Sequence, residues 1–188
     1  MSIITLLRHR LVRIYQSYFP EPLTTAEHEL VREKLTPSLH ALFYAQPLCD
    51  QRHGLLVYKK CQSLFLQGPT LSVDNPPTDD ELFLASCFHD VAKKDCRFSV
   101  TQRVIVATLL ACIPVRRHDS LRSSSSKLLR RIGIYVDHAE LSWELVSKEV
   151  SSEFVHDATV FHHGYPKGDE PSVSQARNLE LFVVADTL

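Results

Sequence analysis

One predicted helix of this chain is apolar on almost every side and ends on two polar residues. Thr78 and Glu81 have the spacing of a capping box, which marks the start of a helix. The following segment, Leu82–Phe88, is almost entirely apolar, which predicts a buried helix. His89 and Asp90 come directly after it. A carboxylate or an imidazole at such a position must be paired or bound to a metal, because burying it alone is costly.

Two other apolar segments end in the same way. Leu181–Ala185 runs into Asp186, and the apolar residues before position 162 run into His162 and His163. Imidazole and carboxylate groups are common ligands of divalent ions. Adjacent helical residues differ by about 100° in direction, so two consecutive ligands can hold one ion from two sides, and a carboxylate can bridge two ions. The sequence therefore indicates that His89, Asp90, His162, His163 and Asp186 are either paired with other groups or bound to a metal ion.

The dipeptide His-Asp occurs three times in the chain, so it decides nothing by itself. The copy at His118-Asp119 lies in a loop rich in arginine and serine, and we interpret it as a solvated pair. The copy at His156-Asp157 lies on an amphipathic helix, where we expect a surface pair, although it could share a face with the histidine seven residues later. Only the first copy ends a buried helix.

Composition indicates an all-α protein. The 188 residues include only five glycines, and most segments are long and apolar-periodic. A hydrophobic content of 44% with 23% charged residues is sufficient for one substantial core. We expect N-terminal lead-in helices over 1–49, packed on a metal-binding domain over 50–188. The net charge of −1 does not indicate a nucleic-acid partner.

The five cysteines form no C-x-x-C pair, and we expect reduced thiols in a cytoplasmic protein. No stretch approaches the ~18 consecutive apolar residues of a membrane-spanning helix. Residues 2–19 have the pattern of a basic amphipathic helix that either packs on its own domain or lies on a membrane surface. The sequence indicates no oligomeric state. Further helices are predicted over 24–35, 36–43, 50–67, 78–88, 100–113, 126–133, 137–150, 152–163 and from 172 onward. Thr24 and Glu27 form a second capping box at the start of the first of these helices, Asp50 is expected to cap the helix over 50–67, and Ser172 with Gln175 is expected to cap the last one.

In its motifs and their order, the chain resembles the HD superfamily of metal-dependent phosphohydrolases, and more closely the small stand-alone bacterial HD proteins and the HD-GYP branch. The resemblance covers residues 53–186. It is carried by Gln51-Arg52-His53, Phe88-His89-Asp90-Val91-Ala92-Lys93, Asp137-His138-Ala139-Glu140, His162-His163 and Ala185-Asp186.

The resemblance implies a helical bundle of the HD type and a specific ligand set. One metal ion would be held by His53, His89, Asp90 and Asp186. In the binuclear branch a second ion would be held by His138, His162 and His163, with Asp90 as the bridge. Lys93 would lie near the substrate phosphate, so Asp90 and Lys93 are the expected catalytic residues.

The implied activity is hydrolysis of a small phosphomonoester or phosphodiester, with a nucleotide-like substrate expected. One or two divalent ions (Mn, Fe, Co, Ni or Zn) would lower the pKa of water from about 15.7 to near neutrality. Two departures point away from cyclic di-GMP and guanosine tetraphosphate: Gly164-Tyr165-Pro166 follows His163 at once, and Lys93-Lys94 replaces an acidic pair. The alternatives are a non-catalytic regulatory module and a di-iron oxygenase of the HD fold.

Overall fold

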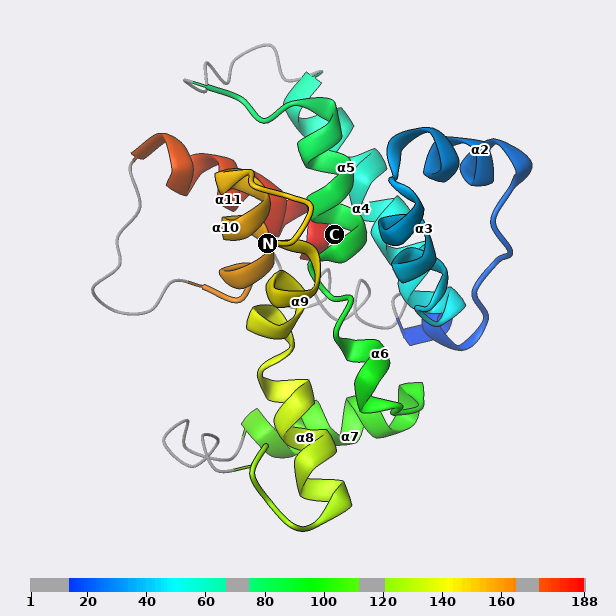
Figure 1. The fold of residues 1–188 in the computed structure, drawn as a ribbon, viewed down its shortest axis with the longest axis vertical. Helices are drawn as coiled ribbons and strands as arrows, with labels where there is room; N and C mark the ends of the chain where they lie inside the picture. The colour runs from blue at the N-terminus through cyan, green and yellow to red at the C-terminus, as the bar shows by residue number, and fades with distance from the viewer. Residues whose placement is uncertain (1–13, 67–74, 112–120, 165–172, 188) are drawn as a thin grey trace.

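The structure is a computed structural model that describes residues 14–66, 75–111, 121–164 and 173–187. Within these ranges all regular secondary structure is helical, which confirms the predicted all-α class (Figure 1). Residues 14–18 are helical, and the remainder of the predicted 2–19 helix lies outside the described residues. The other helices are α2 (Thr25–Lys34), α3 (Pro37–Tyr44), α4 (Leu48–Leu66), α5 (Asp79–Phe88), α6 (Lys93–Cys96), α7 (Val100–Ala111), α8 (Lys127–Val136), α9 (His138–Val146), α10 (Glu153–Val160) and α11 (Val173–Thr187).

No helix in the described part of the chain is long and apolar enough to cross a membrane. Cys61, Cys87 and Cys96 are buried free thiols, and Cys49 is a partly buried one. The fifth cysteine lies outside the described residues, as do the His118-Asp119 pair and the predicted cap at position 172.

Both predicted capping boxes are present. The hydroxyl of Thr24 accepts the N–H of Glu27, and the Glu27 carboxylate accepts the N–H of Thr24 at 2.9 Å. Thr78 and Glu81 repeat the arrangement at the start of α5, where the corresponding backbone bond is 2.8 Å. These bonds satisfy N–H groups that have no partner inside a helix, so they fix where α2 and α5 begin.

One local prediction was wrong, and one short helix was missed. Asp50 was expected to cap a helix, but α4 begins two residues earlier, at Leu48. The Asp50 carboxylate instead binds the guanidinium of Arg103 on α7. The short helix α6 was not predicted, because it has only four residues and ends at Arg97 in the left-handed conformation (φ 52°).

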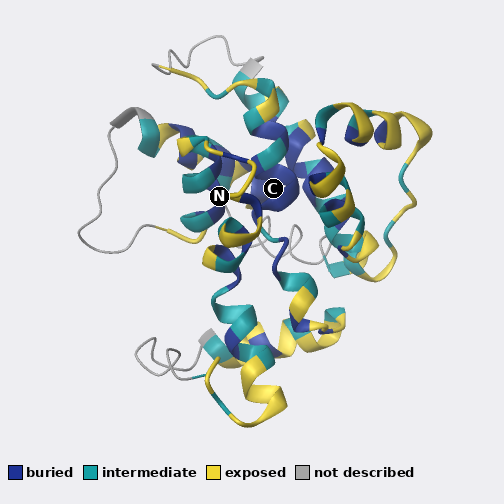
Figure 2. Ribbon diagram, viewed as in Figure 1, coloured by how far each residue is buried: buried dark blue, intermediate teal, exposed yellow. Residues whose placement is uncertain are grey.

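The main hydrophobic core joins helices from both ends of the chain. Phe83 and Phe88 of α5 lie in its centre with Phe182 of α11. Val31 and Phe43 of the lead-in helices belong to the same cluster, so α2 and α3 pack on this core rather than forming one of their own. Figure 2 shows the buried positions gathered where α4 and α5 meet.

A second, smaller core lies at one end of the molecule. Cys96, Phe98 and Val106 are buried there, and Ile132 and Tyr135 of α8 pack against them. Figure 1 shows α6, α7 and α8 together below α9 in this view. The chain passes between the two cores after α5 and again between α8 and α9. Both crossings carry residues of the predicted metal centre.

Gly54 sets the distance between α4 and α5. A Cβ at this position would lie 3.0 Å from Cα of Cys87 and 3.0 Å from the carbonyl oxygen of Ser86. Both atoms are backbone, so the neighbouring helix itself would have to move. His53 is the preceding residue on α4, and thus this close approach helps to place it beside the end of α5.

We predict that Gly54→Ala destabilises the protein. In an open helix interior this change stabilises by about 1 kcal/mol, but overpacking against backbone costs about 1–3 kcal/mol. Urea unfolding should therefore show a lower free energy of unfolding than for the unmodified chain. Ser63→Ala, at an exposed position of the same helix, is the matched control and should have little effect. A stabilised Gly54→Ala variant would contradict the close approach.

Glu27 is a buried carboxylate that joins α2 to α4. It accepts hydrogen bonds from the Thr24 N–H at 2.9 Å, Arg52 Nη1 at 2.6 Å and Lys59 Nζ at 2.7 Å. Burial opposes its ionisation, but the bonds from Lys59, Thr24 and Arg52 outweigh burial and lower the pKa of Glu27 from 4.5 to about 2.

The ionised Glu27 should contribute stability that depends on pH. Since its pKa is lower in the folded state, the contribution is complete above about pH 4.5 and is lost as the pH falls to about 2. At neutral pH we expect Glu27→Gln to lower the free energy of unfolding by roughly 3 kcal/mol, and the difference to shrink over that acidic range. Urea titrations at several pH values measure both. Glu33→Gln, on the exposed side of α2, should show neither effect.

Candidate metal centre

The first group of ligand atoms lies between α4, the end of α5 and the end of α11. His53, His89 and Asp90 each offer an atom within 4.8 Å of the others. Asp186 belongs to the same group: its Oδ1 lies 2.9 Å from His53 Nε2 and 3.4 Å from His89 Nε2. The structure thus brings together four side chains from three distant segments.

The second group lies on the other side of Asp90. His138, His162 and His163 also offer atoms within 4.8 Å of one another, and the Nε2 atoms of His138 and His163 are 3.2 Å apart. Asp90 Oδ1 lies 3.1 Å from His138 Nε2 and 3.5 Å from His162 Nε2. Asp90 Oδ2 lies 3.6 Å from His89 Nε2, in the first group. Asp90 therefore directs one oxygen toward each group.

Three of the histidines are oriented by the same backbone contact. His89 Nδ1 lies 3.0 Å from the carbonyl oxygen of Ser86, and His162 Nδ1 lies 2.8 Å from that of Thr159. His138 Nδ1 lies 2.6 Å from the carbonyl oxygen of the residue three positions before it. A carbonyl can only accept, so each Nδ1 carries a proton, and in the neutral imidazole each Nε2 presents a lone pair to the cluster. Metal-ligating histidines are held in this way in proteins.

Several atoms that face the cluster lack partners. His89 Nε2, His162 Nε2 and Asp90 Oδ1 are buried and have no hydrogen-bond partner among the described residues. In the neutral imidazoles the two nitrogen atoms are acceptors, and the carboxylate oxygen is an acceptor as well. These atoms therefore cannot form hydrogen bonds with one another. Burial of unsatisfied polar groups is costly, and a bound cation removes the cost. The donor set of nitrogen and carboxylate oxygen therefore fits one or two divalent ions.

The electrostatics of the cluster match this donor set. Burial opposes ionisation of Asp90 and Asp186, yet the cationic and imidazole groups around them hold the pKa of each carboxyl well below its usual value. Burial, and then Lys93, lower the pKa of His138. Partial burial and the neighbouring imidazoles lower the pKa of His163. At neutral pH these groups are in the forms that bind metal ions.

His89 differs from His138 and His163 in the direction of its pKa shift. Burial opposes its protonation, but the carboxylates of Asp90 and Asp186 outweigh burial and raise the pKa of His89. The two carboxylates thus attract positive charge to this point. A divalent ion would supply that charge in place of the proton.

Lys93 lies beside the bridging carboxylate. Its Nζ is 2.6 Å from Asp90 Oδ2 and 5.9 Å from the centre of the Tyr135 ring. Burial opposes its charge, but Asp90 outweighs burial and raises the pKa of Lys93, so the side chain is an ammonium. Lys93 is the residue predicted to contact the substrate phosphate, and it lies at the edge of the ligand cluster.

A small cavity of about 120 Å³ connects the cluster to the surface. His53, Asp90 and Lys93 line it, as do Arg103 and Tyr135. Pockets that enclose drug-sized ligands have about 300–1,000 Å³, so this cavity encloses only a small group.

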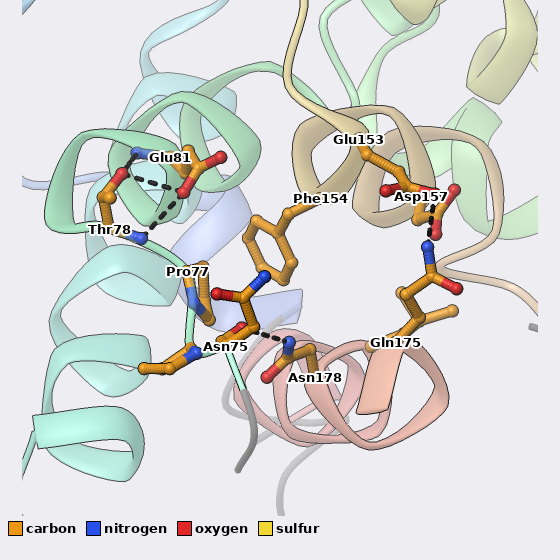
Figure 3. Close-up of a pocket in the computed structure, with 11 residues that line it drawn as sticks. Asn75, Pro77, Thr78, Glu81, Glu153, Phe154, Asp157, Gln175 and Asn178 are labelled. Atoms are coloured by element: carbon orange, nitrogen blue, oxygen red, sulfur yellow. Dashed lines mark hydrogen bonds between the residues drawn. The ribbon is translucent and has the colours of Figure 1, made fainter. Parts of the chain in front are cut away.

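A larger cavity of about 510 Å³ lies elsewhere, between the start of α5, α10 and α11 (Figure 3). None of the predicted metal ligands lines it. Glu81, one of its carboxylates, accepts hydrogen bonds from Thr78 and from Ser152. Figure 3 also shows the amide of Asn178 donating to the carbonyl oxygen of Asn75. These side chains organise helix starts and loops, and they do not converge on one point.

The structure brings the seven predicted ligands together, with Asp90 between the two groups. The His156-Asp157 pair stays apart, as expected: the two side chains contact each other at 2.9 Å, and neither belongs to either ligand group. Asp50 and Arg103 were missed as residues of the cavity. A signal was present, because Arg103 is the one charged residue of the mostly apolar helix α7.

Comparisons with protein-family models, curated proteins and solved structures find no match for this chain. The HD resemblance therefore rests on the sequence motifs alone.

From the two ligand groups we predict how many metal ions each chain binds. Elemental analysis of the protein purified without chelators should find up to two divalent ions per chain. His53→Ala should remove the ion of one group and His163→Ala that of the other, while Asp90→Ala should remove both. His156→Ala is the matched control and should keep the metal content of the unmodified chain. A chain that stays free of metal even after incubation with Mn²⁺, Fe²⁺ or Zn²⁺ would contradict this prediction.

Proposed function

We propose that this chain is a metal-dependent phosphohydrolase of the HD type. The observation that carries the proposal is the position of Asp90, whose two oxygens face two groups of ligand atoms. Such sharing of one carboxylate is the arrangement expected of a binuclear centre, and Lys93 provides a cation beside it. His53, His89 and Asp186 would hold one ion with Asp90, and His138, His162 and His163 would hold the other.

Divalent ions in such a centre supply Lewis acidity and water of lowered pKa. The residues of the chain have their own roles. The buried imidazoles and carboxylates exclude bulk water, which strengthens electrostatic interactions in the cavity. The Lys93 ammonium can donate hydrogen bonds to a non-bridging phosphoryl oxygen and stabilise the charge that develops there.

The size of the cavity supports a phosphoryl group as the enclosed part of the substrate. Within about 120 Å³ the wall offers Lys93 and Arg103 as cationic donors. In a phosphomonoester or phosphodiester the leaving group would extend toward the mouth. A nucleoside, if the substrate carries one, would lie mostly outside the enclosed space.

The activity can be measured with p-nitrophenyl phosphate and bis-p-nitrophenyl phosphate on the Mn²⁺-loaded protein. Lys93→Met should lower turnover by about 10²-fold or more, because one preorganised donor to the reacting oxygens is lost, and should leave the metal content unchanged. Lys94→Met is the matched control, since Lys94 pairs with the exposed Asp95. Metal-loaded protein that hydrolyses neither ester would contradict the proposal, and oxygen consumption by an iron-loaded chain would favour the oxygenase alternative.

A further inference from the structure

A buried ion pair forms part of the wall of the same cavity. Arg103 of α7 donates to Asp50 of α4 through two nitrogens, Nη1 to Oδ1 at 2.6 Å and Nη2 to Oδ2 at 2.8 Å. The two side chains are only 16% and 14% exposed. This bidentate contact fixes the plane of the guanidinium. Asp50 therefore orients Arg103 within the cavity wall.

The Nε–H of this guanidinium is not satisfied. Arg103 Nε is buried and has no hydrogen-bond partner among the described residues. Leaving a charged donor without a partner costs more than leaving a neutral one, so the position favours an acceptor. An anionic oxygen is the acceptor that suits a guanidinium best.

The other cations of the cavity wall have other roles. Arg52 donates to the buried Glu27 at 2.6 Å, and Lys93, which contacts Asp90 at 2.6 Å, is the donor assigned to the scissile phosphoryl group. Arg103 is the cation of this wall whose Nε–H has no acceptor among the described residues. Divalent ions bound at the centre would make the cavity more positive still, which favours anionic ligands.

Arg103 also lies at a distance from the metal ligands. Its partner Asp50 precedes His53 by three residues on α4, which places the two about one helical turn, or about 4.5 Å, apart along the helix axis. A phosphoryl group at the ligand cluster and an anionic group beside Arg103 would therefore be neighbours within one small molecule.

We propose that Arg103 binds a second oxyanion of the substrate, close to the scissile phosphoryl group, and that Asp50 holds it in position. The inference rests on the proposed function and narrows its substrates to phosphate esters that carry a nearby carboxylate or second phosphate. The competing explanation is that the Asp50–Arg103 pair only ties α4 to α7.

Two ligands of matched size test this proposal without turnover. In 2-phosphoglycolate a carboxylate replaces the methyl group of ethyl phosphate, so the ratio of their affinities measures recognition of the second oxyanion. Titration calorimetry on the full-length protein, with and without bound Mn²⁺, should show 2-phosphoglycolate bound at least about tenfold more tightly, the effect of one hydrogen bond from a charged group. Equal affinities would overturn the proposal.

Variants separate recognition from stability. Asp50→Asn should keep the preference, because the amide oxygen still accepts from the guanidinium. Asp50→Asn with Arg103→Gln should abolish it, and the double change avoids leaving a buried carboxylate unpaired. If both variants keep the same preference, Arg103 does not bind the oxyanion and the pair is structural. Metal content and thermal stability of each variant are measured alongside. An absence of metal or of esterase activity would refute the proposed function, whereas the affinity ratio reports on Arg103 alone.

Discussion

The rest of this structure depends on histidine and aspartate side chains whose acceptor atoms converge in one buried space. His89, His138 and His162 each use one ring nitrogen on a backbone carbonyl three residues earlier, and the other nitrogen is thereby committed to the cluster. Nearby, the Asp90 carboxylate adds further acceptors and no donor. The Lys93 ammonium contacts one oxygen of Asp90, but Asp90 Oδ1 and the Nε2 atoms of His89 and His162 have no hydrogen-bond partner among the described residues. A bound cation would satisfy these atoms, and it would account for the polar residues at the ends of apolar helices.

The cluster lies where two hydrophobic cores meet. His53, His89 and Asp186 are held by helices of the main core, whereas His138 follows α8, which packs in the smaller one. Lys93 opens the short helix α6 at the other crossing between the cores. The positions of these side chains relative to one another therefore depend on how the two cores sit against each other, and the ion pair between Asp50 and Arg103 is one direct link between them.

Much of this arrangement could be predicted from the sequence, and the physical reason differs from one element to the next. Capping boxes are local, so Thr24 and Thr78 located the starts of α2 and α5 correctly. The buried ends at His89 and Asp186 were visible because a polar group at such a place needs a partner. Asp50 was misjudged because acidic residues are common both as caps and in ion pairs, and only tertiary structure tells which. Helix α6 gave no periodic signal, since four residues make barely one turn.

The position of the ligands across two cores has a consequence for folding. An ion held by residues of both cores would be released whenever either core opened, so ion binding would suppress partial unfolding as well as complete unfolding. The smaller core has few buried side chains of its own, and in the absence of ions it should exchange its amide hydrogens more readily than the main core. Loading the centre would then merge two regions of unequal stability into a single cooperative unit.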